Sequence, residues 1–237
     1  MKPNLRIAFF LLSCFVSVSL SAGVTQPGVA KLQFSNLSVN STPVVNTHIL
    51  TPGEDSALSK IESKYRGSLS RLKEQGQAIA AYAKANNYNT ERVFLMDMTL
   101  PSGKNRFFVY NIKKAEVEAA SLVTHGFGSN KYENDDPLEF SNVPDSKKTS
   151  LGRYKIGKSY FGQFGLAYRL YGLDSTNDKA FQRDIVLHAH KRVPEKETFP
   201  DYIIVSSGCP TVSPAFLTKL DNYIKSSAKP ILLWIYN

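Results

Sequence analysis

The residues of this 237-residue chain that could do chemistry lie between His188 and Cys209. Cys209 belongs to the run Ser206-Ser207-Gly208-Cys209-Pro210, whose residue types are those of an exposed nucleophile. A thiolate is the attacking species, and free cysteine with a pKa near ~8.5 is only slightly ionised at neutral pH, so a base or a positive dipole must assist it. His188 is the candidate base. The run favours a catalytic cysteine over the alternative, a small buried hydrophobic side chain.

Pro210 predicts the surroundings of the thiol. Its ring disfavours the helical conformation for Cys209, and proline is common at the first helical position, so we expect Cys209 at a helix N-cap, where the helix dipole favours a thiolate. Because Pro210 has no N–H, an oxyanion must be held by the N–H groups of Cys209 and of Gly208 or Ser207. Gly208 permits close approach of a substrate.

His188 lies in the apolar run Asp184–His190, which predicts a buried strand. The strand period of two places His188 and His190 on one face, so that one can act as base while the other supports it. A zinc site built from this pair with His125 or Cys209 is an alternative. No third ligand has convincing spacing, so we expect no metal.

This order of residues resembles the signature of the YkuD-type L,D-transpeptidases, and more narrowly the murein L,D-transpeptidase catalytic-domain subfamily. The resemblance covers about residues 90–237. It rests on IVLHAH followed by SSGCP, and on HGFGS (125–129), FSNVPDSKKTSLGRY (140–154), YFGQFG (160–165), Leu173, Asn177-Asp178 and Arg183. Ala189 departs from the usual glycine after the base, and Ser207 stands where many relatives have histidine.

The resemblance implies an exported acyltransferase of peptidoglycan. The Cys209 thiolate, partnered by His188, attacks the diaminopimelate carbonyl of a tetrapeptide stem, releases D-alanine and forms a thioester. An amine then gives a 3→3 cross-link, or water makes the protein a carboxypeptidase. Ser206 or a backbone carbonyl orients His188. No cofactor is implied.

A long turn-rich segment, 126–165, is interpreted as one wall of the substrate cleft. We expect Tyr160 and Arg183 in this cleft. His125 has two interpretations, a cleft residue or the end of a strand entering a turn.

Two other functions stay open from the sequence. One is an exported cysteine peptidase or amidase that cuts another bond with the same nucleophile and base. The other is a wall-binding module that kept the fold and lost turnover.

Residues 1–21 have the pattern of a signal peptide, with Lys2 and Arg6 before an apolar run and small residues at Ser19–Ser21. An uncleaved anchor and lipidation of Cys14 are the alternatives. If Cys14 is removed, Cys209 is the remaining cysteine and no internal disulfide can form. We therefore expect a protein of the periplasm or cell envelope with no stable membrane span after cleavage.

The chain carries 29 Lys and Arg against 20 Asp and Glu, a formal net charge of +9. A basic exported protein suits anionic wall polymers or membrane surfaces, although the same charge also aids solubility. We expect peptidoglycan stem peptides as partners, no nucleic acid, and a monomer. Nucleotide and nucleic-acid motifs are absent from the sequence.

The pattern predicts a mainly β fold with accessory helices, an L,D-transpeptidase-like β-sandwich domain preceded by a short helical segment. Residues 22–52 are interpreted as a linker, 53–89 as one or two helices broken near Gly76, and 90–237 as the catalytic domain. Strands are expected at 92–100, 106–112, 116–125, 166–173, 184–190, 201–207 and 231–236. Ser213 and Pro214 predict the start of a helix that runs through Lys225.

Overall fold

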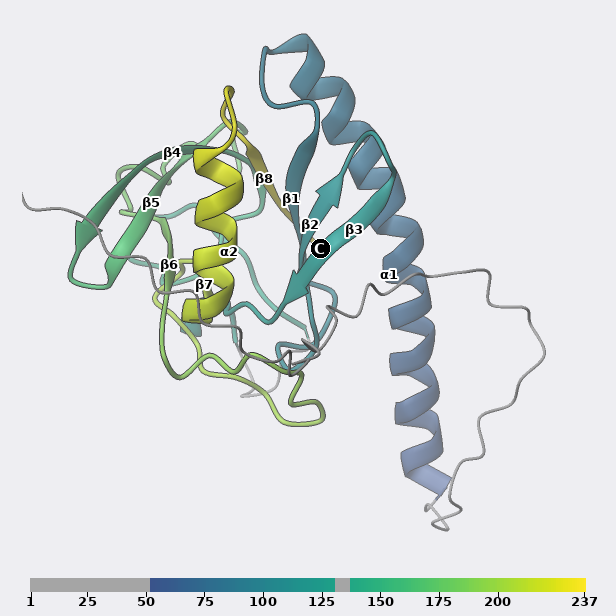
Figure 1. Cartoon of the computed structure of the whole chain (residues 1–237). Helices are drawn as coiled ribbons and strands as arrows, with labels where there is room; N and C mark the ends of the chain where they lie inside the picture. The colour runs from purple at the N-terminus through teal and green to yellow at the C-terminus, as the bar shows by residue number, and fades with distance from the viewer. Residues whose placement is uncertain (1–51, 131–136) are drawn as a thin grey trace, which may run out of the picture. The chain divides into compact units, whose positions relative to one another are not determined.

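A computed structural model describes residues 52–130 and 137–237 (Figure 1). The predicted signal peptide and nearly all of the linker lie outside them. The described part forms one eight-stranded sheet in the order β3-β2-β1-β8-β4-β5-β6-β7. Its elements are α1 (Pro52–Ala85), β1 (Arg92–Asp97), β2 (Phe107–Asn111), β3 (Glu116–Ser121), a short 3-10 turn (Phe127–Ser129), β4 (Gly152–Gly162), β5 (Gly165–Gly172), β6 (Val186–Ala189), β7 (Thr211–Val212), α2 (Pro214–Lys225) and β8 (Leu232–Tyr236).

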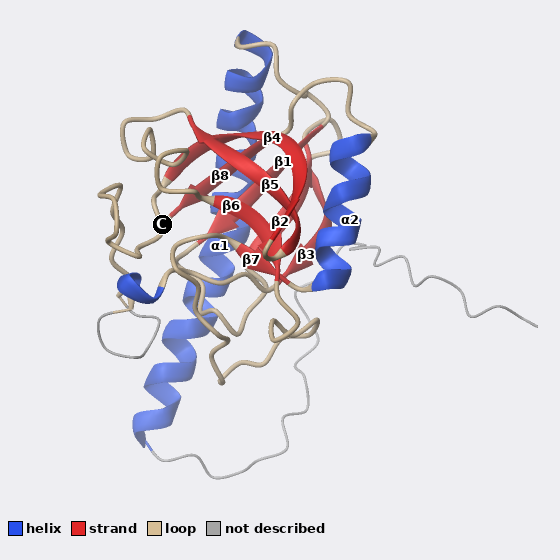
Figure 2. Ribbon diagram, turned by 90° about the vertical axis from the view of Figure 1, so that its left-hand side faces the viewer, coloured by secondary structure: helices blue, strands red, loops and turns tan. Residues whose placement is uncertain are grey.

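The two helices cover opposite faces of the sheet (Figure 2). Side chains of a strand alternate between the faces, and β1 is buried on both. Val93 and Leu95 of β1 pack in one apolar cluster with Leu72 and Ile79 of α1. Phe94 and Met96 belong to a second cluster, which includes the apolar face of α2: Phe216, Leu217 and Leu220. The sheet is thus sandwiched between two apolar layers.

The predicted fold class is confirmed in its main features. The hairpin of β1 and β2 forms with antiparallel register, and strands occupy the predicted regions around 116–121, 165–172, 186–189 and 232–236. The predicted start of α2 is also confirmed, because the Ser213 hydroxyl accepts a hydrogen bond from the Phe216 N–H and Pro214 opens the helix. No helix among the described residues is long and apolar enough to cross a membrane.

Three expectations about elements are wrong. The helix does not break at Gly76: α1 continues through it, and a Cβ there would lie 2.4 Å from Cε1 of Tyr110, so the glycine lets α1 approach β2. Residues 201–207 form no strand; only Ser206 makes a bridge, to Gly126. The segment 126–165 is not all loop, since its last third is β4, the longest strand of the sheet.

The edge formed by β5, β6 and β7 carries the candidate catalytic residues. β5 pairs antiparallel with β6, and β6 pairs parallel with the short β7, with His188 opposite Thr211. The main chain from Ser206 to Pro210 leads directly into β7. The sheet therefore brings together two sequence segments that are separated by more than a dozen residues.

Candidate active site

Cys209 and His188 lie on neighbouring segments at this sheet edge. His188 belongs to β6, and Cys209 lies just before β7. Cys209 precedes Thr211 by two residues, so the parallel register places it beside Val186, two residues before His188. The Cys209 Sγ accepts a hydrogen bond from the Val186 N–H at 3.4 Å, and its thiol donates to the Asp184 carbonyl oxygen at 3.6 Å. The structure thus places the two predicted residues on neighbouring segments, offset by two residues, which is about 6–7 Å along the strand direction.

The expected helix N-cap at Cys209 is wrong. Pro210 is followed by β7, and α2 starts only at Pro214. Proline disfavours the helical conformation for the residue before it, but that preference fits entry into a strand as well as entry into a helix. Cys209 is therefore not the N-cap of either described α-helix, and the contacts that the structure gives its thiol are with local groups.

Three hydroxyl groups surround the carbonyl oxygen of Cys209. The Ser206 Oγ lies 2.7 Å from it, the Thr124 Oγ1 3.2 Å and the Thr211 Oγ1 3.3 Å. Thr124 and Thr211 are linked as well, because the Thr211 N–H donates to the Thr124 hydroxyl at 3.1 Å. The peptide that carries the candidate nucleophile is thereby held in one orientation. Neither threonine was identified from the sequence, because hydroxyl residues are common and their spacing carried no signal.

His188 is held by both of its ring nitrogens. A carbonyl only accepts, so Nδ1 carries the proton that is donated to the Ala189 oxygen at 3.1 Å. Nε2 is then the acceptor, and the Thr211 hydroxyl donates to it at 3.0 Å. The ring of Phe164, from the turn between β4 and β5, stacks on the imidazole with centroids 4.3 Å apart. His188 thus presents the tautomer that a general base needs.

The local electrostatics favour a neutral pair in this state. Burial lowers the pKa of His188, an effect that the hydrogen bond to the Ala189 carbonyl partly offsets and neighbouring His190 reinforces. Burial raises the pKa of the Cys209 thiol, an effect that the Val186 N–H and the Arg183 charge partly offset. Both shifts favour the neutral forms of the two groups, imidazole and thiol. A neutral His188 can accept a proton.

The loop before Cys209 offers two free main-chain donors. The Gly208 N–H is occupied, since it donates to the Ser206 hydroxyl at 3.1 Å. Within the described part of the chain, the N–H groups of Ser207 and Cys209 have no acceptor. Gly208 has a φ of 115°, and a Cβ there would lie 3.0 Å from the Lys148 carbonyl oxygen. Only glycine fits this position without strain, and it leaves the two donors available for an oxyanion.

A cleft of about 460 Å³ opens beside this loop, lined by Pro144, Asp145, Lys147, Gln182, Arg183, Asp184 and Ser207. Neither Cys209 nor His188 lines it, and we call it the catalytic cleft because Ser207 and Asp184 of its lining lie beside Cys209. Three of its non-glycine residues have left-handed backbone conformations: Asp145 (φ 59°), Lys147 (φ 54°) and Asp184 (φ 51°). Backbone strain of this kind is concentrated at functional sites. This supports the prediction that part of the segment 126–165 forms a cleft wall.

Arg183 lines this cleft, but its guanidinium is used to hold the wall. It donates to the Ser141 carbonyl at 2.8 Å, the Lys148 carbonyl at 2.6 Å and the Ser150 hydroxyl at 2.9 Å. Its charge also lies close enough to Cys209 to favour the thiolate. Arg183 is thus placed to fix the loop 141–150 beside the candidate nucleophile.

The structure places His125 in the interior, with 0% of its surface exposed, so of the two interpretations the cleft role is wrong. The buried Arg106 guanidinium lies 2.9 Å from His125 Nδ1, and arginine can only donate, so Nδ1 is the acceptor. The His125 carbonyl accepts from the Ser206 N–H at 2.8 Å. His125 therefore supports the loop that leads to Cys209 through its main-chain carbonyl.

Two further predicted residues have other partners than Cys209 and His188. Tyr160 lines a different cleft, between β4 and α2, where Arg169 covers its ring. The His190 Nδ1 accepts from the Arg192 N–H at 3.2 Å and no hydrogen bond joins it to His188. The zinc alternative needs three ligands together, and the described residues contain no group of three His, Cys, Asp or Glu side chains placed to hold a metal ion.

The family model of the L,D-transpeptidase catalytic domain matches residues 68–236 of this chain. The chain therefore belongs to that family. The match begins inside α1 and thus includes the half of the helix that packs on the sheet. No curated protein matches this chain.

Solved structures similar to this chain include the helical cell shape determining protein Pgp2 from Campylobacter jejuni (13% identity, TM-score 0.39, 62% of this chain and 47% of that one). Others are an L,D-transpeptidase from Mycobacterium smegmatis (14%, 0.36, 62% and 59%) and the Enterococcus faecium L,D-transpeptidase (11%, 0.37, 62% and 50%). The chain spans about half of the length of the proteins it matches.

Proposed function

We propose that this protein is a peptidoglycan L,D-transpeptidase that uses Cys209 as its nucleophile and His188 as its general base. Membership of the family supports the reaction class. The observation that carries the assignment of residues is the meeting of β6 and β7, which places Cys209 beside the strand of His188 and aligns Thr211 with the imidazole.

In the proposed acylation, the thiol proton passes to Nε2 of His188 as Sγ attacks the diaminopimelate carbonyl of a tetrapeptide stem. Before attack, Nε2 accepts a hydrogen bond from the Thr211 hydroxyl, so the Thr211 side chain must first rotate away from it. The Thr211 hydroxyl then has an alternative acceptor, the Cys209 carbonyl oxygen at 3.3 Å. The N–H groups of Ser207 and Cys209 stabilise the oxyanion, each contributing about 3–4 kcal/mol if it resembles measured oxyanion donors.

Collapse of the tetrahedral intermediate breaks the bond to the terminal D-alanine, and His188 returns its proton to the leaving amine. The thioester on Cys209 then reacts with the amine of a second stem, or with water. The cleft beside Ser207 and Arg183 is where we place the donor stem. The predicted signal peptide supports action in the cell envelope, as part of the same proposal.

The test uses purified protein and defined tetrapeptide muropeptides, with products separated by chromatography and identified by mass. We expect release of D-alanine together with cross-linked dimers or trimmed tripeptides, and no products from Cys209→Ala. Cleavage of ordinary protein substrates without release of D-alanine would instead support a peptidase. A folded protein that binds muropeptides but gives no product would support a wall-binding module.

A further inference from the structure

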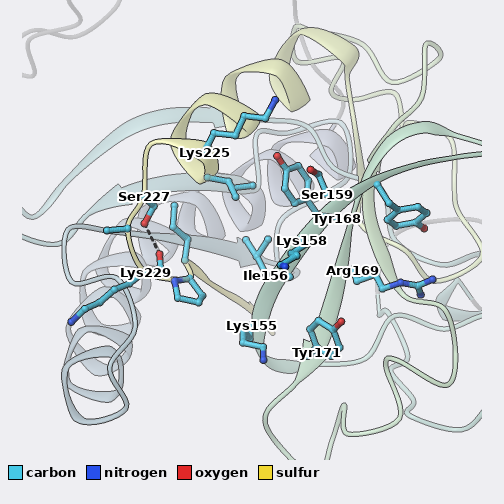
Figure 3. Close-up of a pocket in the computed structure, with 16 residues that line it drawn as sticks. Lys155, Ile156, Lys158, Ser159, Tyr168, Arg169, Tyr171, Lys225, Ser227 and Lys229 are labelled. Carbon is cyan, nitrogen blue, oxygen red and sulfur yellow. Dashed lines mark hydrogen bonds between the residues drawn. The ribbon is translucent and has the colours of Figure 1, made fainter.

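A second cleft, of about 830 Å³, lies between the β4–β5 hairpin and the C-terminal end of α2 with the loop that follows it (Figure 3). It shares no lining residue with the catalytic cleft. We call it the cationic cleft, because five of its lining residues are Lys155, Lys158, Arg169, Lys225 and Lys229, and none is acidic.

The charges of this cleft are only partly balanced. Lys225 pairs with Asp221 at 2.7 Å, and Arg169 with Asp184 at 3.4 Å. Lys155, Lys158 and Lys229 make no ion pair with any described residue. Like charges gathered on one surface repel each other, and an anion bound between them relieves that repulsion.

Two of the cations are held in position by aromatic rings. The Lys155 Nζ lies 4.8 Å from the centre of the Tyr171 ring, and the Arg169 guanidinium 5.0 Å from that of Tyr160. A side chain that is already ordered loses less entropy when it binds a ligand. The cleft is therefore partly preorganised for an anion.

The arrangement of the lysines indicates the form of the ligand. They approach from different sides of the cleft: Lys155 and Lys158 from β4, Lys225 from α2 and Lys229 from the following loop (Figure 3). They do not converge on one point, as the ligands of a single small anion do. Charges spread along an open cleft match a chain on which negative groups recur.

We propose that the cationic cleft binds an extended polyanion, a polymer with phosphate or carboxylate groups repeated along its chain. The Arg169–Asp184 ion pair joins the rims of the two clefts, since Arg169 lines the cationic cleft and Asp184 the catalytic cleft. A polymer bound in the cationic cleft thus lies next to the catalytic cleft. The proposal does not depend on the chemistry of Cys209.

The experiment measures binding of the full chain to inorganic polyphosphate, poly-glutamate and orthophosphate by titration calorimetry over a series of NaCl concentrations. We expect both polymers to bind, orthophosphate to bind far more weakly at equal anion concentration, and affinity to fall as salt rises. The polymer that binds with the higher affinity shows whether phosphate or carboxylate is the preferred group. Equal binding of orthophosphate and polyphosphate would overturn an extended ligand.

The deciding comparison is between two triple variants of equal charge. Lys155→Gln/Lys158→Gln/Lys229→Gln removes the unpaired lysines of the cleft, and Lys84→Gln/Lys196→Gln/Lys219→Gln removes three exposed lysines elsewhere. We expect the first to weaken polyphosphate binding about tenfold or more and the second to change it little. Equal losses would show that net charge alone drives binding and would contradict the proposal. The thermal unfolding midpoint and the alkylation rate of Cys209 check that both variants are folded.

Discussion

Thr211 is the residue that connects the candidate base to the candidate nucleophile. Its hydroxyl reaches the His188 Nε2 at 3.0 Å and the Cys209 carbonyl oxygen at 3.3 Å, and it is almost completely buried. We interpret it as a positioning residue that holds the imidazole before attack and then turns to the carbonyl, which leaves Nε2 free to take the thiol proton.

Removal of this hydroxyl should therefore slow turnover. We expect Thr211→Val to lower kcat by about tenfold or more with a small change in KM, since the base loses its orientation and the substrate keeps its contacts. Thr211→Ser keeps the hydroxyl and should restore most of the rate. The measurement is kcat and KM with a tetrapeptide muropeptide over a range of pH. A Val variant as fast as the Ser variant, with the same pH profile, would remove Thr211 from the account.

The thiol should titrate late. Burial raises the pKa of Cys209, so the folded protein keeps its proton to a higher pH than free cysteine does. The rate of alkylation by iodoacetamide should accordingly keep rising above ~pH 8.5, the ordinary value for cysteine. The urea-unfolded chain is the control and should titrate near that ordinary value. A rate that is already at its plateau near neutral pH would indicate a preformed ion pair with His188.

The sequence singled out candidate residues more readily than it predicted their surroundings. Cys209 and His188 became candidates because a thiol before Pro210 and a histidine in an apolar strand are uncommon patterns, and their catalytic roles stay a prediction. The roles of Thr124 and Thr211 could not, because they depend on three hydroxyls meeting at one carbonyl. The burial of His125 depends on Arg106, nineteen residues earlier in the chain, and no local pattern predicts that contact.

The β4–β5 hairpin extends over the candidate base. Its turn carries Phe164, which is 47% exposed and stacks on His188, while Phe161 of the same hairpin is 82% exposed. The stacking removes water from one face of the imidazole, which contributes to the burial that lowers the pKa of His188. The hairpin thus helps to keep the base neutral.

Loss of this ring should raise the pKa of His188. We expect Phe164→Ala to shift it upward toward the ordinary histidine value, because water then solvates the charged form. Phe161→Ala, which removes a ring of the same type from the same hairpin, is the matched control and should leave the value unchanged. The measurement is an NMR pH titration of the His188 ring protons. No shift in the Phe164 variant would mean that the stacking is incidental.

At the level of elements, strand prediction succeeded where apolar residues alternate or run together and failed where other forces decide. β4 was missed because it carries three glycines, two lysines, an arginine and a serine, and its pairing on both sides supplies the stability that its composition does not. The apolar run at 201–207 was mistaken for a strand. Its Ile203 packs with Leu122 and Val193 in a small separate cluster. This packing buries the Ile203 side chain without any pairing to the sheet.

Helix α1 forms one face of the domain and is more than a segment that precedes it. Ser68 and Arg71 bind the buried Asp97 carboxylate of β1 at 2.8 and 3.1 Å. Gly76 lets the helix backbone approach Tyr110, which is 4% exposed. The interface of α1 with the sheet should therefore contribute to the stability of the whole domain.

Two glycines of α1 provide a matched test. Gly76→Ala should lower the free energy of unfolding by about 1–3 kcal/mol, because its methyl group meets the buried ring of Tyr110. At Gly67 an added Cβ would meet only the Arg71 guanidinium, 2.9 Å from Nη1, and no buried ring. A small shift of this group, which also binds Asp97, offsets the gain in helix propensity of up to ~1 kcal/mol, so Gly67→Ala should change stability little. Urea unfolding monitored by circular dichroism measures both. Equal effects at the two positions would show that α1 does not pack tightly on the sheet.

The central claim for the whole molecule is that its sheet edge turns Cys209 into an acyl carrier for a wall peptide. In the most direct measurement, the protein is incubated with a tetrapeptide muropeptide and the reaction is quenched with acid. The mass of the proteolytic peptide that contains Cys209 is then determined. The account predicts an added mass on Cys209 equal to the stem without its terminal D-alanine. The Cys209→Ser protein, which has no sulfur at this position, should form no thioester. Release of D-alanine at full rate by Cys209→Ala, or turnover with no acyl group ever found on this sulfur, would contradict it.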